Sequence, residues 1–474
     1  MTTRRRQWAA FVIVVALIGG LSLDRIDDPR LGEAPAVATT AQVRSDVVDT
    51  SWFCPFGQWP NAGLTAGVVR LANIGPSDRR AVVRTFSAGG ESKQTGVDIP
   101  AAGAVEVPLE GLLGGTAGGA VVDVDGGGVA VEHRVDGQGG RTTAPCHSDT
   151  ANEWHLAAGI TEVGTHLRLA LLNPFPAPAI ADLTFATDEG AATPRSLTAL
   201  VVPPRSTVFV DVADHVRRRA RVSVSIRLRS GRLAVDRVLD LVGAGRRGTA
   251  LAPAVAHPAS RWHFAEGFTG PGVAERLYVY NPSDEEVAVD VEVRPDGEAT
   301  DVEPFELTVP PADTVVLDLS AAERVPPGAH SIIVESFGDT TVIAEREVAA
   351  TDPSSRRGVG LAIGAAQPAR IWVLVDGRAN EGTDQWLVIA NGADSGVTAR
   401  VEALVGGSRL ALDGLSEVAV EPRGRTAIRV GDHIRRDQLT LVVTASGPVV
   451  VERDLYAVEG IGMSTVLGIP DFGV

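Results

Sequence analysis

The stretch RWHFAEG, Arg261–Gly267, decides the fold of this chain because it occurs in four versions. The other three are SWFCPFG (Ser51–Gly57), EWHLAAG (Glu153–Gly159) and RIWVLVDG (Arg370–Gly377). In each version a tryptophan begins an extended run of residues that ends at a glycine. The four tryptophans are Trp52, Trp154, Trp262 and Trp372. Repetition of this kind marks a chain built from copies of one structural unit.

Two further landmarks follow each tryptophan at nearly constant spacing. The first is an asparagine that closes the next apolar run, at Asn73, Asn173, Asn281 and Asn391. The second is a strand in which an acid precedes a base. These pairs are Glu132 with His133, Asp236 with Arg237, Glu345 with Arg346, and Glu452 with Arg453. Landmarks that recur together define four homologous repeats of roughly 100 residues each.

The pattern within each repeat predicts β-structure. Short Val, Leu and Ile runs alternate with polar residues and are separated by Asn-Pro, Pro-Pro, Asp-Gly and Gly-Gly turns. About seven strands in roughly 100 residues is the scale of an immunoglobulin-like sandwich. We therefore predict an all-β fold of four tandem immunoglobulin-like β-sandwich repeats after an N-terminal hydrophobic helix. A β-propeller-like arrangement of the repeats is the alternative, although propeller blades have about half this period.

The expected boundaries follow from these landmarks. The repeats span residues 49–147, 148–257, 258–367 and 368–474, and we refer to them as repeats 1 to 4. Stacked sandwiches of this kind would form a semi-rigid rod or arc.

The N-terminus has the features of an export signal. An arginine cluster at residues 4–6 precedes an apolar run at residues 8–23, and acidic residues follow. We interpret residues 1–23 as a cytoplasmic Arg cluster and membrane anchor or signal segment, and residues 24–48 as a flexible linker. An uncleaved anchor is favoured, because no small-residue cleavage site directly follows the apolar run. Cleavage would instead give a secreted protein.

Cys54 and Cys146 are the only cysteines, and they flank repeat 1. An exported chain passes into an oxidising compartment, so we predict that the two form a disulfide.

The charge of the chain argues against nucleic-acid binding. The formal net charge is −16, whereas binding to phosphate backbones requires a cationic face. The expected partners are the membrane, through the N-terminal segment, and an envelope glycan or envelope protein.

The pattern W-x-F-x-x-G, L-x-x-N-P, V-P-P and E-R resembles repeats in an uncharacterised family of actinobacterial cell-surface proteins. The resemblance covers Trp52 to the C-terminus and is best in repeat 3. Repeat 1 departs from it at Ile74 and His133, and repeat 4 at Gly392 and Glu421. It implies one N-terminal anchor with β-rich repeats outside the membrane, and it implies no activity, cofactor or catalytic residue.

The repeats separate apparent catalytic residues from structural ones. Glu266 aligns with Ala158 in repeat 2, so we interpret it as a solvated turn acid. His263 aligns with Phe53 and Val373, which favours a packing role. The four tryptophans are expected to be core anchors. Stacking on carbohydrate is their alternative role.

The acid–base pair does recur, which favours a structural role. Adjacent strand residues point to opposite faces, so an acid and its neighbouring base cannot reach one substrate together. We expect each arginine to lie along the core with its head paired. Asp211 and Asp318 are the candidate partners. We predict no catalytic residue, no metal ligand and no cofactor, because no known catalytic or nucleotide-binding motif fits its context.

These observations favour a non-enzymatic exported cell-envelope scaffold or interaction protein. The first alternative is a glycan-binding cell-surface protein that uses exposed aromatic rings. The candidate rings are Trp59, Phe268, Tyr278, Tyr280 and Trp386. The second alternative is an envelope carbohydrate-active enzyme or hydrolase, which requires paired carboxylates.

Overall fold

The computed structural model describes residues 40–90, 92–243, 245–297 and 302–473. The expected anchor and most of the expected linker lie outside these residues. Among the residues described, no helix has the length and hydropathy needed to cross a membrane.

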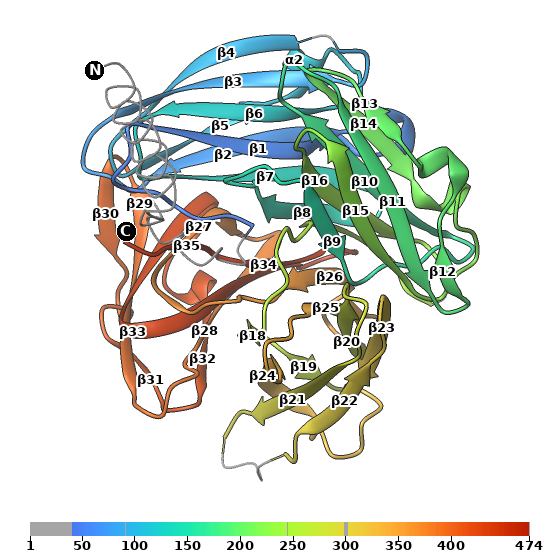
Figure 1. The fold of residues 1–474 in the computed structure, drawn as a ribbon. Helices are drawn as coiled ribbons and strands as arrows, with labels where there is room; N and C mark the ends of the chain where they lie inside the picture. The colour runs from blue at the N-terminus through green and yellow to red at the C-terminus, as the bar shows by residue number, and fades with distance from the viewer. Residues whose placement is uncertain (1–39, 91, 244, 298–301, 474) are drawn as a thin grey trace, which may run out of the picture. The chain divides into compact units, whose positions relative to one another are not determined.

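The prediction of an all-β fold is confirmed (Figure 1). Repeat 1 forms two sheets, with strand orders β1-β6-β3-β4 and β5-β2-β7-β8. The strands are β1 (Asp49–Gln58), β2 (Thr65–Asn73), β3 (Arg79–Ser87), β4 (Ser92–Ile99), β5 (Gly103–Pro108), β6 (Gly118–Asp125), β7 (Val129–Gly137) and β8 (Gly140–Pro145). Two short helices join them, η1 (Pro60–Ala62) and α2 (Glu110–Leu113).

Repeat 2 has the same plan, with orders β14-β10-β16-β17 and β12-β11-β15-β9, and with β13 paired to β11. Its strands are β9 (Glu153–Leu156), β10 (Thr165–Asn173), β11 (Ala179–Thr187), β12 (Gly190–Ala192), β13 (Leu200–Val202), β14 (Ser206–Asp211), β15 (Val222–Ser230), β16 (Ala234–Leu241) and β17 (Gly248–Pro253). The short helices are η2 (Arg195–Leu197) and η3 (Val212–Asp214).

Repeat 3 pairs its strands as β18-β24-β21-β22 and β23-β20-β25-β26, and β19 pairs with β24. Its strands are β18 (Arg261–Phe264), β19 (Phe268–Thr269), β20 (Val273–Asn281), β21 (Val287–Pro295), β22 (Phe305–Val309), β23 (Asp313–Asp318), β24 (Gly328–Ser336), β25 (Ile343–Ala350) and β26 (Gly358–Ile363).

Repeat 4 differs because one long strand, β33, runs through both of its sheets. The first part of β33 pairs with β27 and β29, and its second part pairs with β28 and β34. The elements are β27 (Ala369–Ala379), β28 (Thr383–Ala390), β29 (Val397–Val405), β30 (Ser408–Ala411), β31 (Val418–Val420), β32 (Arg425–Arg429), η4 (Val430–Asp432), β33 (Arg436–Ala457), β34 (Met463–Leu467) and β35 (Ile469–Asp471).

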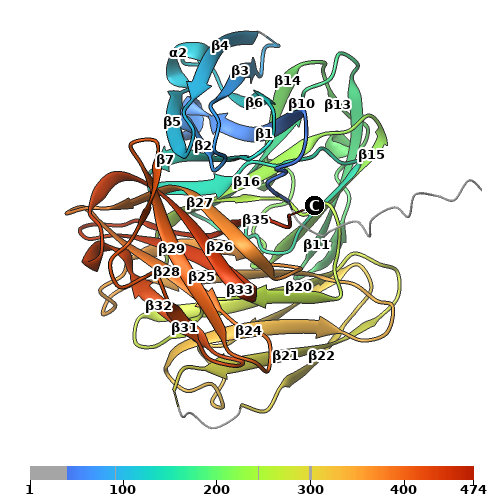
Figure 2. The ribbon, with the colours of Figure 1, turned by 90° about the vertical axis from the view of Figure 1, so that its left-hand side faces the viewer.

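The two sheets of a repeat share one hydrophobic core. In repeat 1 this core includes Trp52 on β1 and Val122 on β6 from one sheet, and Leu71 on β2 and Val131 on β7 from the other. The core does not end at the repeat boundary: Val373 of repeat 4 belongs to the same cluster. Figure 2 shows the sheets from a second direction. Alternating strands therefore bury one face within a repeat and still contribute side chains to a neighbour.

The four tryptophans are all fully buried, with exposed fractions of 2% or less. The indole N–H groups of three of them donate to the backbone carbonyl that lies three residues before the acid of the acid–base pair, at Leu233, Val342 and Val449. A ring enclosed in this way has no free face for a sugar, so the alternative of carbohydrate stacking is wrong for these four residues.

The four asparagines make the same set of hydrogen bonds in every repeat. Asn281 is fully buried, and its amide donates to the carbonyls of Glu285, Val309 and Pro310. Its Oδ1 accepts from the backbone N–H of Ser283. Asn73, Asn173 and Asn391 repeat this arrangement. Each asparagine therefore joins its own turn to the Pro-containing segment that follows.

Replacing Asn281 by alanine is expected to lower the free energy of unfolding by about 2–4 kcal/mol, because it leaves buried carbonyl groups without donors. Urea denaturation followed by tryptophan fluorescence measures this loss. Asn152→Ala, at an exposed position, is the matched control and should have little effect. Equal midpoints for the two variants would contradict the assigned role.

Candidate functional site

The acid–base strands are the candidate site because they carry every charged residue of the repeat signature. They are β7, β16, β25 and β33, and each lies between the strand that carries the asparagine motif and the last hairpin strand of its repeat. All four acids, the three arginines and His133 have exposed fractions of 1% or less. Because a buried charge has lost its water, each of these side chains requires a counter-charge or hydrogen-bond partners.

The partners come from neighbouring repeats. Where repeats 2 and 3 meet, the guanidinium of Arg237 lies 2.7 Å from a carboxylate oxygen of Glu345. That carboxylate also accepts from the backbone N–H of Ala158, at 2.7 Å. Arg237 in turn donates to the carbonyl oxygen of Ala158. We call this set of contacts junction 2–3.

Junction 3–4 repeats the geometry one step along the chain. Arg346 of repeat 3 donates to Glu452 of repeat 4 at 2.9 Å, and the backbone N–H of Ala265 donates to the same carboxylate at 2.6 Å. A second acid, Glu275, lies 3.7 Å from Arg346 and 2.9 Å from Nε2 of His330.

Junction 4–1 joins the last repeat to the first. Both terminal nitrogens of Arg453 donate to Glu132, at 2.8 and 3.3 Å. The backbone N–H groups of Val375 and Asp376 donate to the same carboxylate at 2.9 and 3.0 Å. Thr143 completes the shell through its hydroxyl.

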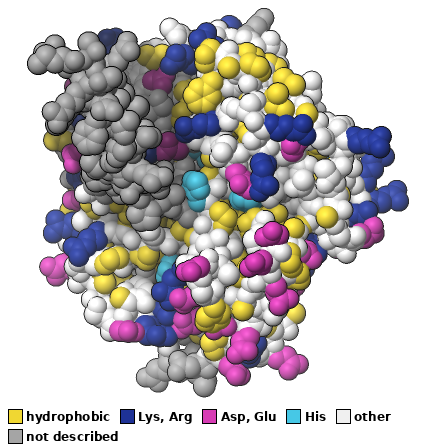
Figure 3. Space-filling model, in the orientation of Figure 1, with side chains coloured by type: hydrophobic (Ala, Val, Ile, Leu, Met, Phe, Trp, Pro, Cys, Tyr) yellow, Lys and Arg dark blue, Asp and Glu magenta, His cyan; other side chains and the backbone are white. Residues whose placement is uncertain are grey.

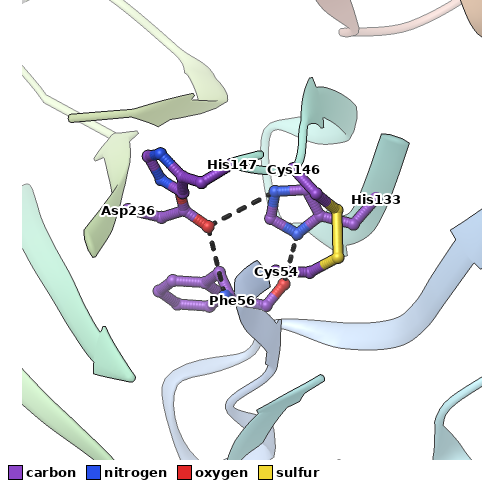
Figure 4. The surroundings of a disulfide bond; sticks show 6 residues. All are labelled: Cys54, Phe56, His133, Cys146, His147 and Asp236. Carbon is purple, nitrogen blue, oxygen red and sulfur yellow. Dashed lines mark hydrogen bonds and ion pairs between the residues drawn. A yellow bond between two sulfur atoms is a disulfide. The ribbon is translucent and has the colours of Figure 1, made fainter. Parts of the chain in front are cut away.

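Junction 1–2 uses imidazoles in place of the guanidinium (Figure 4). His133 presents Nε2 to Asp236 at 3.3 Å, and its Nδ1 lies 2.8 Å from the carbonyl oxygen of Phe56. His147 contacts the other oxygen of Asp236 through Nε2 at 2.8 Å. The backbone N–H of Phe56 donates to Asp236 at 3.3 Å. The predicted disulfide between Cys54 and Cys146 is present beside these groups.

The four junctions form a closed cycle. The acid of each repeat enters the preceding repeat, and the acid of repeat 1 enters repeat 4. Figures 1 and 2 show repeat 1 (blue) and repeat 3 (yellow) each lying between repeat 2 (green) and repeat 4 (red). The expected rod or arc is therefore wrong, because such an array would leave repeats 1 and 4 apart.

The last hairpin strands, β8, β17, β26 and β34, line a small cavity at the centre of this cycle. Its volume is about 30 Å³, which is roughly the space of one water molecule. Thr40 and Ala41 also line it. It is too small to be a ligand site.

Burial and pairing shift the pKa values of these groups in different directions. Burial opposes ionisation of Glu132, but Arg453 and the backbone donors outweigh it and hold the pKa of Glu132 below its ordinary value. Burial raises the pKa of Glu452, and Arg346 offsets this only in part. Burial also lowers the pKa of His133, despite the neighbouring Asp236.

Asp454 is the one acid of the acid–base strands without a partner. It is fully buried, and neither of its oxygens has a hydrogen bond to any described residue. Burial, reinforced by the negative charge of Glu266, holds the pKa of Asp454 well above the ordinary range. This residue follows Arg453 directly, and the repeat alignment gave no sign of it because the aligned positions are Arg134, Val238 and Glu347.

A family model described as "Family of unknown function (DUF5719)" matches residues 129–263 and 243–455. Together the two matches cover more than half of the chain, including the acid–base pairs of all four repeats. The chain belongs to this family.

No curated protein is similar enough to the chain to count as a match. The solved structures that share a low similarity with it include the following three. The crystal structure of Thermotoga maritima 1070 has 18% identity and a TM-score of 0.21, and the match covers 23% of this chain and 94% of that chain. An Anabaena sensory rhodopsin transducer has 20% identity and a TM-score of 0.17, with 19% of this chain and 83% of that chain covered. A Streptomyces avermitilis alpha-L-rhamnosidase complexed with L-rhamnose has 12% identity and a TM-score of 0.13, with 89% of this chain and 57% of that chain covered. At these TM-scores none of them informs the function of this member of the family.

Several expectations about side chains were wrong. Asp211 does not pair with a signature arginine but contacts His166 and Arg168. Asp318 pairs with Arg276. Each signature arginine instead binds an acid of the next repeat.

Glu266 is not a solvated turn acid. It is 7% exposed and lies 2.8 Å from Arg425, which is on β32 of repeat 4. His263 is mostly buried, and burial lowers its pKa to about 4, consistent with a packing role.

The five proposed aromatic platforms do not form an open surface. Tyr278 and Tyr280 are buried. Phe268 and Trp386 both pack around the guanidinium of Arg356, and Trp59 packs against Phe209.

The carboxylates give no sign of a metal centre. Among the described ranges, no group of three or more His, Cys, Asp or Glu residues is placed to hold a metal ion.

Arg346→Ala is expected to lower the free energy of unfolding by about 3–5 kcal/mol, because it leaves Glu452 buried without its counter-charge. The matched control is Arg229→Ala, which removes an exposed pair with Asp182 and should change stability little. Chemical denaturation of both variants measures the difference. If Arg346→Ala were as stable as the control, the junction would not hold the cycle together.

Asp454→Asn is expected to stabilise the protein increasingly as pH rises. An acid whose pKa is raised in the folded state holds its proton more tightly there, so the wild type loses stability as pH rises above the unfolded pKa of about 3.9. Asparagine has nearly the same shape as aspartic acid but does not ionise, so the variant lacks this dependence of stability on pH. Denaturation midpoints at pH 5, 7 and 9 should therefore diverge between variant and wild type. The exposed control Asp339→Asn should show a constant difference across the same range.

Proposed function

We propose that this member of the family is a non-enzymatic, exported cell-envelope scaffold or interaction protein. In this proposal residues 1–23 anchor the chain in the membrane, and four immunoglobulin-like sandwiches are held outside it. The resemblance of the repeats to actinobacterial cell-surface proteins supports this proposal, because it implies one N-terminal anchor with β-rich repeats outside the membrane.

The closed cycle of buried ion pairs is the observation that carries the proposal. The conspicuous acids and bases of the sequence are used to join repeats, and their exposed fractions leave them no access to a substrate. Four junctions of this kind fix the positions of the repeats relative to one another. Their outer surfaces can therefore present binding sites to partners in a constant arrangement. On the face drawn in Figure 3, acidic, basic and hydrophobic side chains are interspersed, as on a surface exposed to solvent.

The disulfide supports the export part of the proposal. Bonds between cysteines persist in oxidising compartments, and the Cys54–Cys146 bond lies in the core of repeat 1.

A combined localisation and capture experiment tests the scaffold role. The full chain, the Arg346→Ala variant and the Arg229→Ala control are expressed in the native envelope, where thiol labelling reports the state of Cys54 and Cys146. We expect all three to be oxidised and accessible to external protease. Crosslinking in intact envelope should then capture the same partners with wild type and control, and fewer with Arg346→Ala.

Two results would contradict the proposal. Reduced cysteines in cells would place the repeats in the cytoplasm. Release of soluble sugar when the purified chain is incubated with cell-wall glycan would instead favour the hydrolase alternative. Binding of that glycan without release would favour the glycan-binding alternative.

A further inference from the structure

Junction 4–1 contains a cavity beside a buried arginine. The cavity has a volume of about 330 Å³, at the lower end of the range for small-molecule sites. Repeat 1 lines it with residues of the β7–β8 turn, and repeat 4 lines it with Arg378, Thr383 and the loop between β33 and β34. Leu455 and Ile461 supply apolar surface.

The guanidinium of Arg378 is short of partners. Arg378 is 9% exposed, and its Nε is buried without a hydrogen bond to any described residue. The one ion pair it makes within the described part of the chain is with Asp376, at 3.7 Å. The other oxygen of Asp376 is occupied by Arg134, at 2.8 Å. A buried cation with one distant, shared counter-ion lacks the compensation that burial normally requires.

The charges around the cavity do not balance. Three charged side chains line it: Asp136 and Arg141, which pair with each other, and Arg378, which leaves one positive charge. Burial lowers the pKa of Arg378 to about 10, and the pull of Asp376 does not compensate because Arg141 and Arg134 oppose it.

The sister repeats show that the fold does not need a cation here. The position after the conserved glycine is occupied by Gln58, Ile160, Phe268 and Arg378. Gln58 donates to a backbone carbonyl within repeat 1, and Phe268 packs against Arg356. Only the fourth repeat places a charge at this position, and it does so beside a cavity.

We propose that this cavity binds a small organic monoanion through a carboxylate group. The carboxylate accepts hydrogen bonds from the guanidinium of Arg378, and a short apolar chain contacts Leu455 and Ile461. One negative charge neutralises the surplus positive charge of the cavity lining. A dianion such as phosphate fits less well, because Asp136 and Asp376 repel its second charge.

Isothermal titration calorimetry of the full chain with butyrate tests this proposal. Butyramide, which has the same shape without the charge, is the matched ligand control. We expect butyrate to bind and butyramide not to bind. Arg378→Gln should weaken butyrate binding roughly tenfold or more. Arg400→Gln, at an exposed position of the same repeat, should leave the affinity unchanged.

Further ligands distinguish the source of the carboxylate. Glucuronate represents an acidic sugar, and N-acetylalanine represents a peptide C-terminus. Whichever of the two binds more tightly identifies the class of the natural ligand. A thermal midpoint for Arg378→Gln at or above that of wild type confirms that the variant is folded. The proposal is overturned if no carboxylate binds, if Arg378→Gln binds butyrate as well as wild type, or if inorganic phosphate binds more tightly than butyrate. These outcomes do not depend on the scaffold role.

Discussion

An ionised carboxylate can be buried only where hydrogen-bond donors and positive charge replace the water that it has lost. Each repeat of this protein buries the carboxylate of its acid–base pair in this way, and the neighbouring repeat supplies the replacement. Glu345 shows the rule: its counter-charge is Arg237 and its backbone donor is Ala158, both from repeat 2. A repeat on its own would hold an unpaired acid and an unpaired base. The association of the repeats follows from this constraint.

The direction of these contacts explains why they close. Each repeat uses one surface to give its acid and a different surface to receive one, which makes the contacts head-to-tail. Contacts of this kind extend indefinitely unless the rotation between units brings the last surface to the first. Here Glu132 of repeat 1 accepts two hydrogen bonds from Arg453 of repeat 4. Every acid and base of the signature is therefore paired. Linear repeat arrays need polar capping units instead.

The sequence was enough to predict the strands and the structural character of the signature, because alternation and turn residues are local properties. Asn281 illustrates this, since Asn-Pro at a strand end predicts a turn-binding amide, and its amide binds the turn. The partners could not be predicted. Arg346 and Glu452 lie 106 residues apart, and no local pattern reports which repeat will face which. Glu266 was misplaced for the same reason, because Arg425, which lies 2.8 Å from it, belongs to repeat 4.

Junction 1–2 shows how the cycle tolerates a weaker base. The imidazole of His133 replaces the guanidinium, and burial disfavours its charged form. Asp236 consequently depends on two other donors, the N–H of Phe56 and Nε2 of His147. Cys54 lies two residues before Phe56, and Cys146 directly precedes His147, so the disulfide ties together the two segments that present these donors (Figure 4). The other junctions hold their acids with an arginine and have no disulfide among the described residues. The covalent bond therefore lies at the junction where the ion pair is weakest. It holds the donors of Asp236 in place, which electrostatic attraction alone does not do there.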